Sequence, residues 1–224
     1  EHPGAGVMLK TNKDRLIETA VEGVVQPASG RGFSVTWDGT PKNSIGTASI
    51  NYTASVGDPV YKWADADHVE PDVTIQGRDK PSASDCAIAS LACIGNPAKV
   101  VSGDAKGSKG VFIGRHAGAD DLVWFPDDIK EKLTLDDRVQ IRSKGVGLVI
   151  DDFEDVKVNK CSPEFLEKIG IEVKDGKLVV PVVAELPGYI LGAGIGYDPN
   201  IETVDYDIQS TCPETNEEFN LKDL

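Results

Sequence analysis

Closely spaced turn residues constrain the fold of this chain more than any other feature of its sequence. Across residues 16–103, short runs rich in Val, Ile, Thr and aromatic residues alternate with Gly, Pro, Asn and Asp about every eight to twelve residues. Strands joined by tight turns produce this pattern, whereas long helices would need uninterrupted stretches. The pattern predicts strands at residues 17–25, 33–37, 47–53, 58–63, 73–76, 87–93 and 99–102.

The second half of the chain mixes strands with two short helices. Strands are expected at residues 111–114, 122–125, 139–142 and 147–150. Ile129 and Leu133 stand four residues apart behind acidic residues, which predicts a helix over 127–133. Ser162 as N-cap, Pro163 at the first helical position and a closing Gly170 predict the other helix.

A hairpin signal follows the second helix, and the whole pattern then defines the fold class. Asp175-Gly176 suits a type I′ turn between strands at 171–173 and 177–180, because this turn needs two positive φ angles. The prediction is a mostly β protein with a few short helices (α+β), built as a small barrel or a sandwich. Residues 56–63 echo residues 135–142, and such corners feed strands into small barrels.

The expected domain organisation places a boundary near Pro126. Residues 1–10 would be an N-terminal arm or the remnant of a tag, residues 11–125 a β-rich domain, and residues 126–224 a mixed β domain with both short helices. A chain of 224 residues also allows one continuous domain across this boundary.

Charge and cysteine content limit the classes of partner. The chain carries 37 Asp and Glu against 23 Lys and Arg, a net charge of −14, so its field opposes nucleic-acid binding. Its most apolar stretch, 179–196, is broken by Pro181, Glu185 and Pro187, which argues against a membrane span and a membrane partner. Four cysteines without CxxC spacing indicate reduced thiols and a cytoplasmic location.

A glycine- and lysine-rich loop at residues 102–110 is the first candidate site. Its three glycines allow backbone amides to point inward, and its two lysines add positive charge, so the loop can cradle an anion. It lacks the Walker spacing, and a solvated hairpin loop is the alternative interpretation. The candidate ligand-binding residues are Lys106, Ser108, Lys109 and Arg115, with Asp104 as a candidate catalytic residue.

His116 is the candidate catalytic histidine. Glycines flank it at Gly114 and Gly118, and its ordinary pKa near 6.5 suits acid–base chemistry at neutral pH. The alternative is a surface or structural histidine. Because one short strand separates the loop from the histidine, we expect Lys106, Lys109 and His116 to converge on one concavity.

An acidic segment at residues 63–72 is the candidate metal site. His68 and Glu70 would face the same side of an extended chain and could hold a divalent metal, the one cofactor that the sequence suggests. A solvated acidic turn is the alternative interpretation. The reaction, any cofactor and the enzyme status remain open at this point.

Several stretches of the chain resemble an uncharacterised prokaryotic family, the domain of unknown function 4438 family. The matching stretches are residues 11–16, 67–71, 93–96, 102–108, 165–171 and 192–196. The resemblance implies a mixed β-rich fold and a cytoplasmic setting, but no reaction. Chains of the family look longer than this one at the C-terminus.

Two function classes follow from these observations. The first is an enzyme or binder of a small anionic metabolite that uses the lysine loop and His116. The second is a non-catalytic structural or assembly subunit, a homo-oligomer whose contacts involve its termini.

Overall fold

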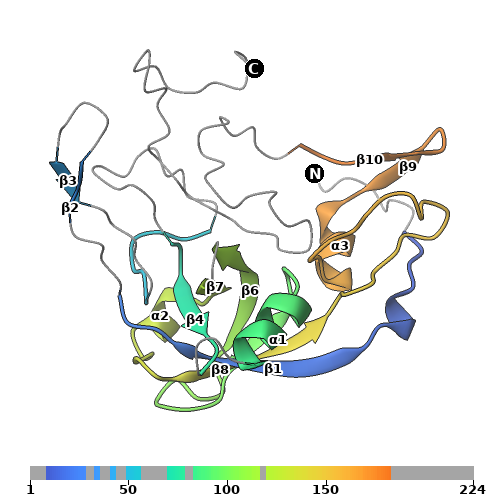
Figure 1. Cartoon of the computed structure of the whole chain (residues 1–224). Helices are drawn as coiled ribbons and strands as arrows, with labels where there is room; N and C mark the ends of the chain where they lie inside the picture. Colours follow the sequence, from blue (N-terminus) through green and yellow to red (C-terminus); the bar gives the residue numbers. More distant parts are fainter. Residues whose placement is uncertain are drawn as a thin grey trace.

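The computed structural model describes residues 9–28, 33–35, 41–43, 49–56, 70–78, 83–116 and 120–182; at residues 33–35, 41–43 and 116 it describes the backbone. Within these residues the protein is mostly β with three short helices (Figure 1). Six antiparallel strands form a closed barrel in the order β1-β4-β7-β6-β5-β8. The expected fold class is therefore confirmed, and of its two architectures the barrel is the one observed.

The barrel strands are short, as the turn spacing predicts. They are β1 (Glu18–Val25), β4 (Val73–Gln76), β5 (Pro97–Val100), β6 (Lys109–His116), β7 (Asp120–Trp124) and β8 (Arg138–Lys144). Two hairpins lie outside the barrel sheet, β2 (Phe33–Val35) with β3 (Pro41–Asn43) and β9 (Glu172–Lys174) with β10 (Lys177–Val179). The helices are α1 (Ala83–Leu91), α2 (Asp127–Lys130) and α3 (Pro163–Ile169), preceded by a 3-10 turn at Lys13–Arg15.

Pairing of β1 with β8 closes the barrel. The two strands lie side by side along the bottom of Figure 1, in a register that runs from Glu18 opposite Lys144 to Val24 opposite Arg138. On β8 every second residue is buried, and Val139 and Ile141 are fully buried in the barrel core. This alternation is the period of two that a strand with one buried face requires.

Helix α1 replaces a strand that the sequence pattern predicts, so the expectation of a strand at residues 87–93 is wrong. Ile88 and Ala92 pack into the barrel core from α1 and from the residue that follows it. Gly23 on β1 makes room for this packing, because a Cβ there would lie 3.1 Å from Cδ1 of Ile88 and 3.0 Å from the carbonyl oxygen of Gln76. Within residues 87–93, Ile88 is buried on the helix, and Ala92 and Cys93 are buried just after it.

Two other expected strands are reduced to single bridges in the described residues. Ile50 bridges to Val73, and Ile150 bridges to Thr11, each outside a named strand. The expected strand at residues 58–63 lies outside the described residues. In the described structure, each of the two bridged stretches therefore pairs with another segment through one isolated β-bridge.

The predicted C-terminal helix and hairpin are confirmed. The Ser162 hydroxyl accepts a hydrogen bond from the amide of Phe165 at 3.1 Å, and Gly170 ends α3 with a φ of 77°. Asp175 and Gly176 have φ angles of 51° and 72°, as a type I′ turn requires. This region has its own small core, formed by Leu148, Ile150, Cys161 and Leu166.

The barrel takes strands from both sides of Pro126, because β8 follows that residue and pairs with β1 and β5. The pairing of β8 therefore joins residues on either side of the expected boundary.

Among the described residues, no helix combines the length and the apolarity that crossing a bilayer would need.

Candidate functional site

The lysine loop is a compact turn between β5 and β6 that uses several of its own amides. Gly107 donates its amide to the carbonyl of Val100 at 2.8 Å, Ser108 to Ala105 at 3.0 Å, and Lys106 to Gly103 at 3.2 Å. These amides are therefore occupied within the loop. An anion there could not use these three amides.

A carboxylate fixes the start of this loop. Asp137 accepts hydrogen bonds from the Ser102 hydroxyl at 3.0 Å and from the Thr134 amide at 2.9 Å. Gly103 has a φ of 63° and packs directly on the Asp137 carboxylate, which leaves no space for a Cβ. Asp104 and Lys106 are exposed at the tip, and Ser108 is partly buried.

The structure separates the predicted site residues along β6. Lys109 begins this strand, opposite Lys99 of β5, and His116 ends it, opposite Asp120 of β7. Eight residues of strand place the two ends about 23 Å apart at roughly 3.3 Å per residue. The lysine loop and His116 therefore do not form one concavity, and the individual roles assigned to them stay predictions.

Glu70 of the candidate metal site is buried and hydrogen-bonded. Its carboxylate accepts the hydroxyl of Thr74 at 2.9 Å, and its backbone carbonyl accepts from Asn51. His68 lies outside the described residues. Within the described part of the chain, no group of three or more His, Cys, Asp or Glu side chains is placed to hold a metal ion.

Asp72, close to Glu70, belongs to a buried ion pair. Its Oδ1 lies 2.8 Å from Nζ of Lys130 on α2, and both side chains are almost completely buried. Its Oδ2 accepts the amide of Val56 at 2.9 Å. This arrangement joins α2 to the segment before β4.

A second buried ion pair lies at the end of β6 and the start of β7. Arg115 and Asp121 are opposite each other in the β6–β7 register, and Nη1 of Arg115 lies 3.1 Å from each carboxylate oxygen of Asp121. Both side chains are buried, Asp121 completely. The hairpin between β6 and β7 thus carries a buried ion pair into the barrel.

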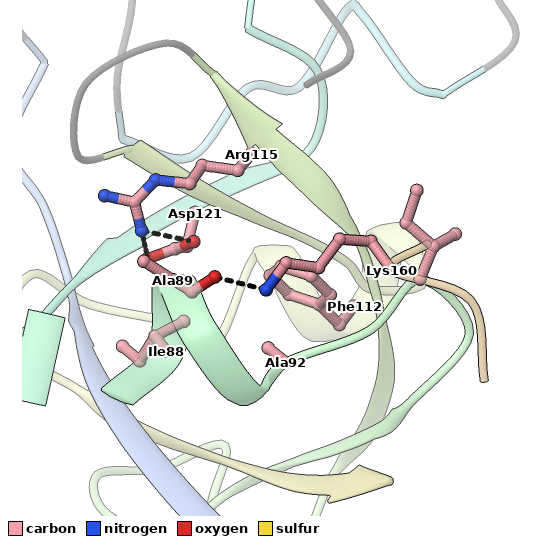
Figure 2. A pocket seen from close by; sticks show the side chains of 8 residues that line it. Ile88, Ala89, Ala92, Phe112, Arg115, Asp121 and Lys160 are labelled. Carbon is pink, nitrogen blue, oxygen red and sulfur yellow. Dashed lines mark hydrogen bonds and ion pairs between the residues drawn. The ribbon is translucent and has the colours of Figure 1, made fainter. Parts of the chain in front are cut away.

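This ion pair lines a small pocket beside α1. The pocket has a cavity volume of about 10 Å³ and is lined by Ile88, Ala89, Ala92, Ile94, Phe112, Arg115, Asp121 and Lys160. Figure 2 shows Lys160 reaching from one side to the carbonyl of Ala89, to which its ammonium donates a hydrogen bond, and Arg115 reaching toward Asp121 from the other. Three charged side chains therefore meet an otherwise apolar surface.

Burial dominates the electrostatics of Asp121. Loss of water around the carboxyl raises its pKa to about 7, against the opposing effect of the Arg115 guanidinium. Asp85 and Asp120 raise the pKa further because a negative charge on each disfavours another on Asp121. A carboxyl with a pKa near 7 can take up and release a proton at neutral pH.

The two neighbouring carboxylates are held by the end of β4. Gly77 donates its amide to Asp85 near the start of α1, and Gln76 donates its side-chain amide to Asp120. The positions of both negative charges relative to Asp121 are therefore set by the barrel and not by mobile side chains.

Sequence reasoning identified Arg115 but missed Asp121 and Lys160. The signal for Asp121 was present, because a hairpin centred on Gly118 places residue 121 opposite residue 115. Lys160 carries no comparable signal. It reaches the pocket through a single parallel bridge between Ile94 and Cys161.

Comparison with known proteins gives a family but no reaction. The model described as "Domain of unknown function (DUF4438), N-terminal" matches residues 33–167, and "Domain of unknown function (DUF4438), C-terminal" matches residues 168–224. The crystal structure of TM1086 is similar, with a TM-score of 0.81 and 40% sequence identity over 94% of this chain and 74% of that chain. None of the curated proteins compared matches this sequence.

Proposed function

The chain belongs to the DUF4438 family, and we propose that it binds a small anionic metabolite beside the charged residues Arg115, Asp121 and Lys160, which line a pocket next to α1. The observation that carries the proposal is the meeting of two cationic side chains and one buried carboxyl in an apolar pocket. Electrostatic interactions are stronger in a small pocket that holds little water than they are at an exposed surface. The exposed lysine loop has no comparable enclosure.

The pocket serves either a binding protein or an enzyme. In an enzyme, Asp121 would exchange a proton with the bound metabolite, because its raised pKa keeps both protonation states populated near pH 7. Arg115 would keep the carboxyl in place through both of its oxygens. His116 follows Arg115 in β6, and its assigned acid–base role remains a separate prediction.

Filling the pocket tests this proposal. We expect isothermal titration with a panel of small anions, including inorganic phosphate, acetate and isobutyrate, to detect saturable binding of at least one of them. Ala89→Leu places a large side chain at the pocket wall and should abolish that binding. Ser90→Leu adds the same side chain at an exposed position of α1 and should leave it intact. Equal binding by both variants would place the site elsewhere.

Self-association is a second candidate property, favoured by the surface of the β9–β10 hairpin. Val173 and Val179 are 41% and 45% exposed there, although Leu178 packs against the small core. Exposed valines on a two-stranded hairpin suit contact with another copy of the chain. Light scattering over a wide concentration range should give a mass above 23.9 kDa, and a constant monomer mass would remove this candidate.

We place this function in the cytoplasm. Cys93 and Cys161 are buried, Cys86 is exposed, and none of these three described cysteines lies in a disulfide. Cysteines outside disulfides suit a reducing compartment.

A further inference from the structure

We propose that the outer face of β5, β6 and β7 is a docking surface for a short acidic segment of a partner protein. Lys99 and Lys109 bind carboxylates of this segment, and Trp124 contacts one of its apolar side chains. The surface shares no residue with the lining of the pocket beside α1, so the proposal does not depend on what that pocket binds.

The pairing register places two rows of side chains on this outer face. Pro97 of β5 is opposite Val111 of β6, and Val111 is opposite Trp124 of β7, the strand that lies beside β6 in Figure 1. Lys99 and Lys109 are opposite each other in the next row, on the same face because the side-chain period of a strand is two. The residues between the rows on β5 and β6 are buried, which identifies this face as the outside of the barrel.

The two lysines form a close pair of like charges. In the next pair along the ladder, the amide of Val100 donates to the carbonyl of Ser108 at 3.0 Å. Because hydrogen-bonded and non-hydrogen-bonded pairs alternate, Lys99 and Lys109 form a non-hydrogen-bonded pair, in which side chains lie closer together. Like charges directly opposite each other destabilise a sheet, so an anionic group bound between these lysines would offset a repulsion that the register imposes.

The positive charge of this pair is not balanced by neighbouring strands. Both lysines are exposed, and within the described residues neither ammonium forms an ion pair or a hydrogen bond. The basic residues of the next strand, β8, differ because they contact carboxylates of β1, in the pairs Arg138–Glu22, Arg142–Glu18 and Lys144–Glu18. Lys99 and Lys109 therefore form a local positive site on a chain with a net charge of −14.

Trp124 adds an apolar contact beside this positive site. Its side chain is 37% exposed, and the partly buried Val111 and the exposed Pro97 continue the apolar row. Lys109 is its diagonal neighbour in the β6–β7 ladder, at a distance of about 7–8 Å that aromatic and long side chains can span. Tryptophan is enriched among the residues that dominate binding at protein interfaces. One bound segment can therefore contact the indole ring and the ammonium groups together.

Charge favours a short protein segment over a nucleic acid at this surface. At physiological ionic strength, exposed charges are largely screened beyond about 8 Å, so a short acidic segment interacts mainly with the nearby lysines. A long polyanion would extend past two lysines onto the surface of a chain whose net charge is −14. The surface therefore suits a protein partner that offers a few carboxylates next to an apolar side chain.

Fluorescence anisotropy of a labelled peptide, titrated with the full chain, tests this surface. The probe is the amidated peptide Glu-Glu-Leu-Phe-Glu-Glu, and its neutral counterpart carries Gln in place of every Glu. We expect the acidic peptide to bind about tenfold more tightly than the neutral one at low salt. Added salt should reduce this difference, because it screens exposed charges.

Charge reversal distinguishes local charge from net charge. Lys99→Glu and Lys109→Glu should each weaken binding of the acidic peptide about tenfold. Lys168→Glu, at an exposed position of α3, changes the net charge by the same amount and should leave binding intact. Either reversal on the barrel replaces a like-charge pair by an opposite-charge pair, so the melting temperature should hold or rise while binding is lost.

A variant of the apolar row tests the other contact. Trp124→Thr should weaken binding of both peptides, because threonine suits a strand but removes the indole ring. Should this variant not fold, the two lysine reversals still decide the proposal.

Four results would overturn the proposal. Equal binding of the two peptides would show that the lysines do not recognise carboxylates. Reversals that behave like Lys168→Glu would show that the peptide binds elsewhere. Binding of oligothymidylate without binding of the acidic peptide would assign the surface to a nucleic acid. If neither peptide binds, the docking surface is wrong, although anion binding beside Arg115 and Asp121 would be unaffected.

Discussion

Asp121 holds its proton to a higher pH in the folded protein than in the unfolded chain. Burial raises its folded pKa from 3.8 to about 7, and the Arg115 guanidinium offsets only part of this effect. Between these two values the folded state retains a proton that the unfolded state has released. The contribution of Asp121 to stability is therefore present below about pH 4 and is lost as the pH rises through 7.

The first prediction concerns this pH dependence. In the wild type, Asp121 should make the free energy of unfolding fall as the pH rises from about 4 to 7. The Asp121→Asn variant lacks the titrating group, so its free energy of unfolding should not show this contribution. The wild-type slope from this group is at most about 1.4 kcal/mol per pH unit. Urea unfolding at several pH values measures the difference between the two slopes. If the free energy of unfolding changed with pH in the same way for wild type and variant, Asp121 would have the same pKa in the folded and unfolded states.

A second prediction concerns the buried pair between Lys130 and Asp72. Lys130→Met leaves the carboxylate of Asp72 buried without its ammonium partner, and we expect a loss of about 3–5 kcal/mol in the free energy of unfolding. Lys132→Met is the matched control, because Lys132 pairs with Asp128 at an exposed position and should cost less than about 1 kcal/mol. Denaturant unfolding distinguishes the two, and equal losses would contradict a structural role for the buried pair.

At the residue level, the sequence allows local partners to be predicted and leaves distant ones undetermined. The Arg115–Asp121 pair follows from hairpin register, which is set within a few residues. The Lys130–Asp72 pair joins residues far apart in the chain, and charge alone does not choose between the many possible carboxylates. The expected meeting of Lys109 and His116 failed because a single strand was assumed to be short, whereas β6 has eight residues.

At the level of elements, capping and turn signals predicted structure better than apolar content did. The helix α3 was predicted from Ser162, Pro163 and Gly170, and the last hairpin from Asp175-Gly176. Residues 87–93 were interpreted as a strand because a short apolar run fits both a buried strand and a buried helix. Ser82 and Asp85 match the capping-box spacing and were the sequence signal for a helix there.

A third prediction tests how strongly α1 is anchored in the barrel. Ile88 is fully buried in the core, so Ile88→Ala should lower the free energy of unfolding by about 2–5 kcal/mol through lost burial and a residual cavity. Ile17→Ala makes the same change at a side chain that is 82% exposed and should be nearly neutral. Thermal or urea unfolding checks both, and a small loss at Ile88 would mean that α1 is dispensable to the barrel.

At the scale of the whole molecule, the net negative charge is expected to disfavour polyanionic partners. The net charge of −14 repels phosphate backbones, and the described strands pair several of their basic residues with Glu18 and Glu22. We therefore expect no binding to duplex DNA or RNA in a mobility-shift assay at low salt, where electrostatic binding is strongest. Salt-sensitive micromolar binding would contradict this fourth prediction.

The pairing of β1 with β8 also orders events during synthesis. Glu18 and its partner Lys144 are separated by about 125 residues, which a ribosome takes roughly 6–25 s to add at about 5–20 residues per second. Throughout that interval β1 lacks the neighbour with which it forms most of its pairing. The nascent chain must therefore keep one strand unpaired until the other arrives, and barrel closure is among the last steps available to it.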